Sequence, residues 1–273
     1  MQNPLISIII PCYNQGRFLN DALDSVIGQD YQNWECIVVN DGSIDNTEEV
    51  ALLYCDKDSR IKYVYKKNGG LSSARNTGIN LSNGKYILPL DSDDKISSEY
   101  CKIAVQELES NDQIKIVYCR ANFFGVKSGE WLLPDFSIEK ILGQNIIFCS
   151  GFFRRSDYNL TSGYNENMKF GLEDWDFWLS LLELGGEVFK IDKVLFFYRI
   201  RIDSMARSLD DEKNRILRKQ LWTNHKKIFS ENFLDPTLTF EYLNYANSFE
   251  YKVGNFVVKP LRKIMRYIYK FFS

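Results

Sequence analysis

The chain has 273 residues, of which 45% are hydrophobic and 26% charged, and its formal net charge is −2. This composition excludes wholesale disorder, and the length allows one large domain or one domain with an appendage. The six cysteines form no C-x-x-C pair and His225 is the sole histidine, so a zinc or disulfide framework and a histidine-based hydrolase triad are both disfavoured.

The N-terminal third of the chain alternates between apolar runs and segments with helical periodicity. The apolar runs predict buried strands within residues 5–14, 34–43, 61–70 and 85–90. The periodic segments between them predict helices at residues 18–27, 45–55 and 71–82. Alternation of strand and helix is typical of a parallel sheet with helices on both faces, so we expect an α/β fold.

Each predicted strand of this region runs into polar or flexible residues at its carboxyl end. The four strand ends read PCYN, NDGS, KNGG and DSDD. In open α/β sheets, ligands bind beyond the carboxyl ends of the strands. We therefore expect these four segments to meet at one edge of the sheet and to form the functional site.

The second half of the chain is less regular. The run IKIVYCRANFFG predicts a strand, and the run VFKIDKVLFFYRI predicts one or two more. Between them, GLEDWDFWLSLLELGG predicts a helix that ends at a pair of glycines. We expect Trp175 and Trp178 of that helix to pack into the core. A polar helical region is predicted for residues 210–232.

The acidic cluster DSDD, residues 91–94, follows an apolar strand and needs an explanation because its carboxylates repel one another. An EF-hand loop from Asp91 would need glycine and glutamate where the chain has Ile96 and Lys102. An exposed acidic turn and a phosphoacceptor site remain as alternatives. A divalent metal held by Asp93, with Asp91 beside it, would use the hard oxygen ligands that Mg²⁺ and Mn²⁺ favour.

Two other classes of nucleotide-binding protein are disfavoured by motifs that the sequence lacks. There is no G-x-x-x-x-G-K-[ST] loop, which a P-loop NTPase would need. There is also no G-x-G-x-x-G turn after the first predicted strand, which a dinucleotide dehydrogenase would show.

Three segments taken together resemble the family 2 inverting glycosyltransferases of GT-A fold, of the bacterial cell-surface polysaccharide type. They read SIIIPCYNQGRFLNDALDSVIGQDYQNWECIVVNDGSIDNT, NGGLSSARNTGINLSNGKYILPLDSDD and GLEDWDFWLSLLELGG, in that order, within residues 5–205. The resemblance implies a Rossmann-like, mostly parallel central sheet flanked by helices, followed here by a C-terminal helical extension. It also implies a divalent cofactor, Mn²⁺ or Mg²⁺.

The resemblance assigns residues to the donor site. Those that match nucleotide-binding positions of the family are Pro11, Tyr13, Asp41, Arg75 and Asp91. Asp41 would accept a hydrogen bond from a ring N–H of the base. Asp91 and Asp93 match the D-x-D motif, with Asp93 favoured as the direct metal ligand, and Asp94 could instead cap the helix that follows.

Inverting transfer also needs a group that deprotonates the acceptor hydroxyl, and a carboxylate can serve as this base. The helix LEDWDFW offers Glu173, Asp174 and Asp176, which cannot all face the acceptor because adjacent helical residues point about 100° apart. The family pattern places the base at Asp174 and makes Glu173 a supporting catalytic group. Arg201 stands where many relatives carry a histidine, and it could pair with diphosphate oxygens as a nucleotide-binding residue.

The segment 257–273 carries five basic and no acidic residues, with apolar residues at helical spacing. A basic amphipathic helix of this kind suits an anionic membrane surface, although docking on the protein's own core or on a dimer partner is the alternative. We expect a cytoplasmic protein, peripheral on the cytoplasmic face of the inner membrane. No stretch reaches the roughly 20 apolar residues of a membrane span.

The sequence thus predicts a GT-A domain at residues 1–205, with a nucleotide-binding half at 1–95 and an acceptor-binding half at 96–205. A helical extension at 206–256 and the basic helix at 257–273 complete the chain. The expected activity is metal-dependent inverting transfer of a sugar from a nucleotide-sugar, by default a UDP-sugar, to a hydroxyl of a glycan or lipid-linked glycan. No nucleic-acid partner is expected. The alternatives are a sugar-1-phosphate nucleotidyltransferase and a non-catalytic scaffold that binds nucleotide-sugars.

Overall fold

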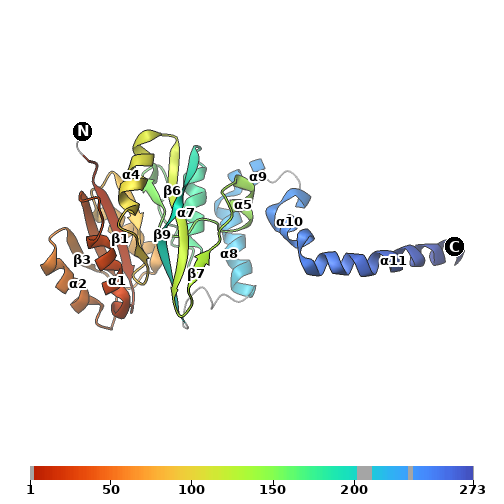
Figure 1. The fold of residues 1–273 in the computed structure, drawn as a ribbon, viewed down its shortest axis with the longest axis horizontal. Coiled ribbons are helices and arrows are strands. Elements are labelled where there is room, and N and C mark those ends of the chain that lie inside the picture. Colours follow the sequence, from red (N-terminus) through yellow and green to blue (C-terminus); the bar gives the residue numbers. More distant parts are fainter. Residues whose placement is uncertain (1–2, 202–210, 233–235, 273) are drawn as a thin grey trace.

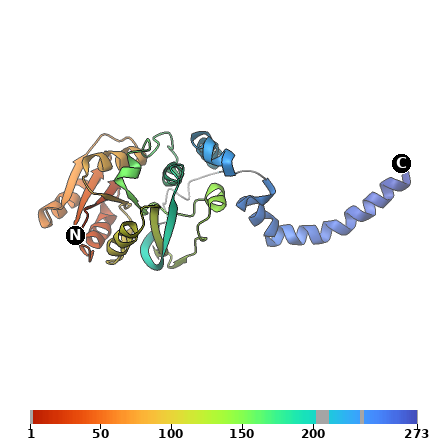
Figure 2. The ribbon, with the colours of Figure 1, turned by 90° about the horizontal axis from the view of Figure 1, so that it is seen from above.

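The computed structural model describes the backbone of residues 3–201, 211–232 and 236–272. A nine-stranded sheet in the order β3-β2-β1-β4-β8-β6-β9-β5, with β7 paired to β6, runs through the body of the molecule. Helices lie on both faces of this sheet, and the last two helices of the chain extend away from it (Figures 1 and 2). The expected α/β fold, with flanking helices and a C-terminal helical extension, is confirmed.

The N-terminal half contains the parallel part of the sheet. Its strands are β1 (Ile6–Cys12), β2 (Trp34–Asn40), β3 (Ile61–Tyr65) and β4 (Tyr86–Pro89), all paired in parallel. The connecting helices are α1 (Gly16–Ile27), α2 (Thr47–Lys57) and α3 (Leu71–Leu81). Every residue of β1, β2 and β4 is buried, as unbroken apolar runs predict.

The second half of the sheet mixes strand directions. Its strands are β5 (Lys95–Ile96), β6 (Ile114–Gly125), β7 (Gly129–Trp131), β8 (Phe152–Arg154) and β9 (Glu187–Ile200). β6 and β9 pair in parallel, whereas β8 runs antiparallel to both β4 and β6, and β5 runs antiparallel to β9. The apolar runs predicted β6 and β9 but not their directions, and the three strands of two or three residues, β5, β7 and β8, were not predicted because they are too short to show a pattern.

Four helices accompany this half: α4 (Tyr100–Ser110), α5 (Ile138–Gly143), α6 (Arg155–Tyr158) and α7 (Glu173–Leu182). The side chains of Trp175 and Trp178 in α7 are buried, and their indole N–H groups donate to the carbonyls of Ile141 and Ile147 at 2.7 and 3.1 Å. Both tryptophans are therefore core residues, as the sequence predicted.

The C-terminal region is helical. It comprises α8 (Asp211–Asn224), α9 (Lys226–Asn232), the short η2 (Pro236–Leu238), α10 (Phe240–Asn247) and α11 (Phe249–Phe272). Helix α11 projects away from the body (Figure 1) and already begins at Phe249, ahead of the expected boundary at residue 257. None of the helices in the described ranges combines the length and the apolarity needed to cross a bilayer.

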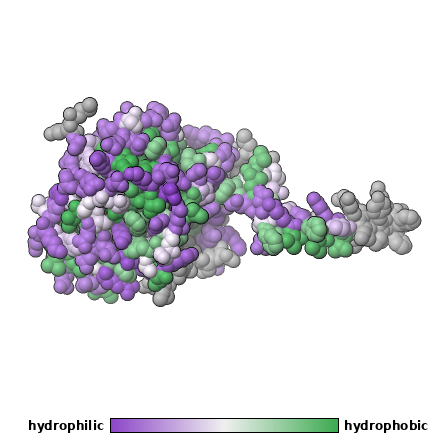
Figure 3. Space-filling model, viewed as in Figure 1, coloured by the Kyte–Doolittle hydropathy of each residue, from purple (hydrophilic) through white to green (hydrophobic). Residues whose placement is uncertain are grey.

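The described part of α11 has an apolar face, seen as a green band along its lower edge in Figure 3. Phe249 and Phe256 are exposed over 78% and 82% of their surface, and Val257 and Leu261 are also exposed. Of the five basic residues that form the predicted charged face, only Lys259 has a described side chain. Arg262, Lys263, Arg266 and Lys270 lie outside the described side chains.

Candidate functional site

A cavity of about 480 Å³ opens at the carboxyl ends of β1, β2 and β4 and extends to the start of α7. All but one of the residues assigned from the sequence line it: Pro11, Tyr13, Asp41, Asp91, Asp93, Glu173, Asp174 and Arg201. Residues of the strand ends PCYN, NDGS and DSDD thus meet at one edge of the sheet. Asn68 and Gly70 belong to the fourth strand end, KNGG, and line the same cavity. The exception is Arg75, which does not reach the cavity wall.

One end of the cavity is built around Asp41, which follows β2. Its Oδ1 accepts from Lys66 Nζ at 2.6 Å and from the backbone N–H of Gly69 at 2.9 Å, and its Oδ2 accepts from the N–H of Gly70 at 2.8 Å. Gly70 has a φ of 88°, which only glycine adopts without strain. A carboxylate accepts about four hydrogen bonds, so Asp41 retains room for one N–H donor from a ligand. The side chain of Tyr13 is half exposed at the same end.

The acidic cluster after β4 is compensated by arginines from β9 and the residue beyond it. Asp93 Oδ2 lies 3.2 Å from Arg201 Nε. Burial raises the pKa of the Asp93 carboxyl to about 6, and the charge of Asp91 adds to this rise while Arg201 opposes it. Asp94 is fully buried, and its Oδ1 accepts from the backbone N–H of Arg199 at 2.7 Å. The expectation that Asp94 caps a helix is therefore wrong, because it precedes β5 and joins that turn to β9.

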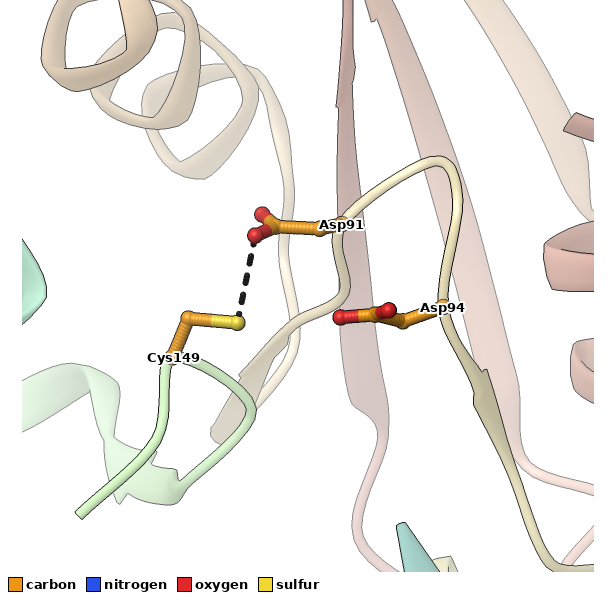
Figure 4. A group of neighbouring side chains, drawn as sticks. All are labelled: Asp91, Asp94 and Cys149. Atoms are coloured by element: carbon orange, nitrogen blue, oxygen red, sulfur yellow. Dashed lines mark hydrogen bonds between the residues drawn. The ribbon is translucent and has the colours of Figure 1, made fainter. Parts of the chain in front are cut away.

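A second feature of this cluster is its approach to Cys149, from the loop between α5 and β8. Potential ligand atoms of Asp91, Asp94 and Cys149 lie within 4.8 Å of one another, and Figure 4 shows the three side chains converging. The thiol donates to Asp91 Oδ2 at 3.3 Å, and burial raises its pKa well above the usual value. Asp94 Oδ2 is buried without a hydrogen-bond partner among the described residues.

These side chains fit a divalent cation. Carboxylate oxygens are the ligands that Mn²⁺ and Mg²⁺ favour, and the unpartnered oxygen of Asp94 is a polar atom that a cation would satisfy. The group differs from the sequence-based assignment, because Asp94 and Cys149 belong to it and Asp93 does not. The role of Asp93 as a direct metal ligand stays a prediction.

Arg75 lies behind the cavity rather than in it. Its side chain is fully buried, with Nη1 donating to Glu173 Oε1 and Nη2 donating to Asp91 Oδ1, both at 2.7 Å. One guanidinium from α3 therefore ties the acidic cluster after β4 to the first turn of α7. Arg75 holds two walls of the site in place, whereas direct contact with a nucleotide would need an exposed side chain.

The three acids of α7 point in three directions. Glu173 turns inward to Arg75, and the fully buried Asp176 accepts from Asn165 Nδ2 at 3.1 Å and from Asn224 Nδ2 at 2.5 Å. Asp176 Oδ1 also lies 3.1 Å from Nε2 of His225, so this acid fastens α7 to the end of α8. Only Asp174 faces the cavity with a carboxylate that no cation occupies among the described residues.

Asp174 sits in an environment suited to proton transfer. Its Oδ2 accepts from Asn145 Nδ2 at 3.1 Å and its Oδ1 accepts from the backbone N–H of Trp175 at 2.7 Å. Burial, together with the charge of Glu173, raises its pKa to about 7. The preceding Leu172 has a φ of 60°, a left-handed conformation that costs a non-glycine residue about 1–3 kcal/mol and is found at functional sites.

Comparison with known proteins decides the family. The family model described as glycosyl transferase family 2 matches residues 7–162, which is more than half of the chain. The chain belongs to the family 2 glycosyltransferases.

Three known proteins illustrate the relationship. The uncharacterised glycosyltransferase EpsJ of Bacillus subtilis is 33% identical over 225 residues, which cover 74% of this chain and 63% of EpsJ, just under two thirds of that relative. The crystal structure of S. aureus TarS 1–349 with UDP aligns with a TM-score of 0.70 at 20% identity, over 92% of this chain and 74% of TarS. The mannosyltransferase PcManGT of Pyrobaculum calidifontis, in complex with GDP-Man and Mn²⁺, aligns with a TM-score of 0.64 at 18% identity. This alignment covers 86% of this chain and 66% of PcManGT. These likenesses confirm the GT-A fold.

Several residues of this family 2 site were not foreseen from the sequence. Asn145, Cys149, Trp131 and Tyr198 all line the cavity and come from the acceptor-side half. The first three lie in the irregular region between β6 and α7, where no periodicity marks a residue as facing a site. The asparagine and the cysteine contact two predicted acids, Asp174 and Asp91, but no sequence pattern links them.

Proposed function

We propose that this family 2 glycosyltransferase transfers a sugar, with inversion and with the help of a divalent metal, from a UDP-sugar to a hydroxyl of a glycan or lipid-linked glycan. One observation carries the proposal: Asp174, with a raised pKa, lines the same cavity as Asp91 and Asp93 of the acidic cluster. That arrangement offers a base for an acceptor and a site for a nucleoside diphosphate within one pocket. A role in a bacterial surface polysaccharide pathway agrees with the family.

The donor end of the cavity would hold the nucleotide. Asp41 keeps one acceptor position for the ring N–H of a uracil, and the exposed ring of Tyr13 offers a surface for the base. Pro11 and Asn68 line the same end. The structures of TarS with UDP and of PcManGT with GDP-Man support a nucleotide-sugar as the donor class.

The diphosphate would lie over the acidic cluster. Asp91 and Asp93, or Asp91 with Asp94 and Cys149, would hold Mn²⁺ or Mg²⁺, which as a Lewis acid stabilises the negative charge of a departing diphosphate. Arg201, whose Nε lies 3.2 Å from Asp93 Oδ2, would pair directly with a phosphate oxygen, whereas the carboxylates would act on the diphosphate only through the metal.

Asp174 would act as the base on the acceptor side. It takes the proton of the attacking hydroxyl as the new bond to the anomeric carbon forms, and the bond to the diphosphate oxygen breaks on the opposite face, which inverts the configuration. Asn145 orients the Asp174 carboxylate, and Glu173 acts through Arg75 to hold the start of α7. General base catalysis of this kind contributes about 10²–10⁴-fold in rate.

Calorimetric titration tests the donor site. We expect the protein to bind UDP in preference to GDP or dTDP with Mn²⁺ present, and we expect EDTA or Asp93→Ala to abolish that binding because the diphosphate charge is then uncompensated. Asp192→Ala removes an acid that is 91% exposed and is the matched control. A folded protein that binds none of the three nucleotides would contradict the proposal, and nucleotide binding without turnover on any acceptor would favour a scaffold.

Arg201→Ala tests the leaving-group contact. Charge-assisted hydrogen bonds contribute about 1.5–3 kcal/mol, so UDP affinity should fall by at least about tenfold. Lys193→Ala, which removes an exposed cation of β9 outside the cavity, should leave the affinity unchanged. Unchanged UDP affinity in Arg201→Ala, measured by the same titration, would rule out this role.

Peripheral association with the cytoplasmic face of the inner membrane is the second part of the proposal. The exposed apolar side chains of α11 and the basic sequence that follows are its support. We expect the full chain to float with anionic lipid vesicles, and the chain truncated after Asn255 to remain in solution. Vesicles of zwitterionic lipid are the control, because each basic residue adds about 1 kcal/mol only near an anionic surface. Equal flotation of the two chains would refute the anchor.

A further inference from the structure

A second cavity, of about 500 Å³, lies on another side of α7 from the catalytic site. Trp175 lines it, whereas the preceding Asp174 lines the catalytic cavity, since adjacent helical residues point about 100° apart. Its remaining walls come from α5, α8, α9 and the η2–α10 segment. A void of this size falls within the range of ligand-binding pockets, about 300–1,000 Å³. No step of the proposed reaction uses it.

The walls of this second cavity are apolar along most of their length. The aliphatic and aromatic side chains that line it are Leu142, Trp175, Leu221, Trp222, Phe229 and Leu238. Trp222 and Leu238 are exposed over 53% and 65% of their surface, so the cavity is open to a ligand from outside. An open apolar groove of this size is costly to leave in water and suits a hydrocarbon chain.

The charges of the groove define its polar end. Arg218 and Glu241 neutralise each other at 2.5 Å, and Glu139 hydrogen-bonds Ser137 at the start of α5. Lys226 is the exposed cation of the lining, with its ammonium 5.6 Å from the centre of the Trp222 ring. A cation beside an exposed tryptophan is the arrangement found where a protein meets lipid headgroups. An anionic headgroup would therefore lie at Lys226, with its chain running inward toward Trp175.

Exposed apolar side chains also lie on the C-terminal helices, one of which forms a wall of the groove. Helix α10 forms one wall and exposes Tyr242, Leu243 and Tyr245, and α11 continues with Phe249 and Phe256. Figure 3 shows green surface on α10 as well as along α11. A membrane that binds the apolar face of α11 would therefore come close to α10, the helix that forms one wall of the groove.

We propose that this groove binds the hydrocarbon chain of an anionic membrane lipid, with Lys226 at the headgroup and Trp175 at the inner end. One lipid chain in contact with Trp175, the neighbour of Asp174, then attaches the body of the protein to the bilayer. This contact adds to the membrane binding proposed for α11. The inference does not depend on the donor nucleotide, since its residues are separate from the catalytic cavity.

Tryptophan fluorescence provides the test, with 9,10-dibromostearate as the probe and stearate as its non-quenching match. Two of the five tryptophans, Trp175 and Trp222, line the groove. We expect saturable quenching by the brominated chain and competition by stearate. In Trp222→Phe the quenching should persist through Trp175, which is buried and can be reached only from inside the groove. Quenching that disappears in Trp222→Phe would mean contact at the surface only and would overturn the proposal.

A matched pair of charge variants supplies the control. Lys226→Glu should weaken the binding of dibromostearate by at least about fivefold, whereas Lys227→Glu makes the same charge change on α9 outside the groove and should not. Equal effects of the two variants, or quenching without saturation, would contradict the inference. UDP titration of the same samples separates the two proposals. A protein that shows the quenching but binds no UDP would contradict the proposed donor site and leave the lipid groove supported.

Discussion

Asp174→Asn is expected to lower kcat by about 10²–10⁴-fold while leaving the affinity for UDP unchanged. The amide keeps the shape of the side chain and its contact with Asn145, but it cannot accept the proton of the acceptor hydroxyl. The donor end of the cavity, around Asp41, is built by other elements and should not sense the change. Release of nucleoside diphosphate measures kcat, and calorimetry measures the affinity.

The pH dependence of the wild-type enzyme should carry the same signature. Burial and Glu173 raise the pKa of Asp174 to about 7, so the base is protonated and inactive below that value and active above it. We therefore expect kcat to rise with pH around a midpoint near 7. Asp174→Asn should lack this rising limb of the pH–rate profile. Asp192→Asn, at an exposed position, should retain both the rate and the limb. An Asp174→Asn enzyme with an undiminished rate would place the base elsewhere.

The backbone of the site followed from the sequence because the apolar runs and their polar ends are local patterns. The segments NDGS and DSDD had to end at one edge of the sheet once β1, β2 and β4 were parallel and buried. A local pattern does not show which side chain of opposite charge each charged residue pairs with. Arg75 belongs to a helix whose buried face is set by spacing, but its two carboxylates are 16 and 98 residues away in sequence.

The same limit explains the other differences. The contacts of Asn145 and Cys149 come from a segment without periodicity, so only tertiary packing reveals them. His225 reads as part of a polar helix, yet it is buried against Asp176 and Glu183 because α8 docks on α7 at that point. Residues whose function depends on a distant partner of opposite charge are those that the sequence assigns least well.

Arg75→Ala is expected to reduce the free energy of unfolding by about 3–5 kcal/mol, because it leaves the Glu173 carboxylate buried without its cation. Asp91 would lose the same partner at the cavity wall. Arg75→Lys should recover only part of the stability, since one ammonium cannot reach two carboxylates as a forked guanidinium does. Urea unfolding measures the change. Lys193→Ala, which breaks the exposed pair with Glu99, is the control and should cost about 1 kcal/mol or less.

The cycle with Glu173→Gln separates a bridging role from a nucleotide contact. If Arg75 acts by holding Glu173, the double variant Arg75→Ala with Glu173→Gln should be more stable than the sum of the single changes predicts, because no unpaired buried charge then remains between them. Any loss of UDP affinity in Arg75→Ala should come from displacement of Asp91. Adding Glu173→Gln should therefore not lower the UDP affinity further. Additive effects of the two changes on stability, together with a full loss of UDP binding in Arg75→Ala, would show instead that the guanidinium contacts the nucleotide, as the family resemblance implies.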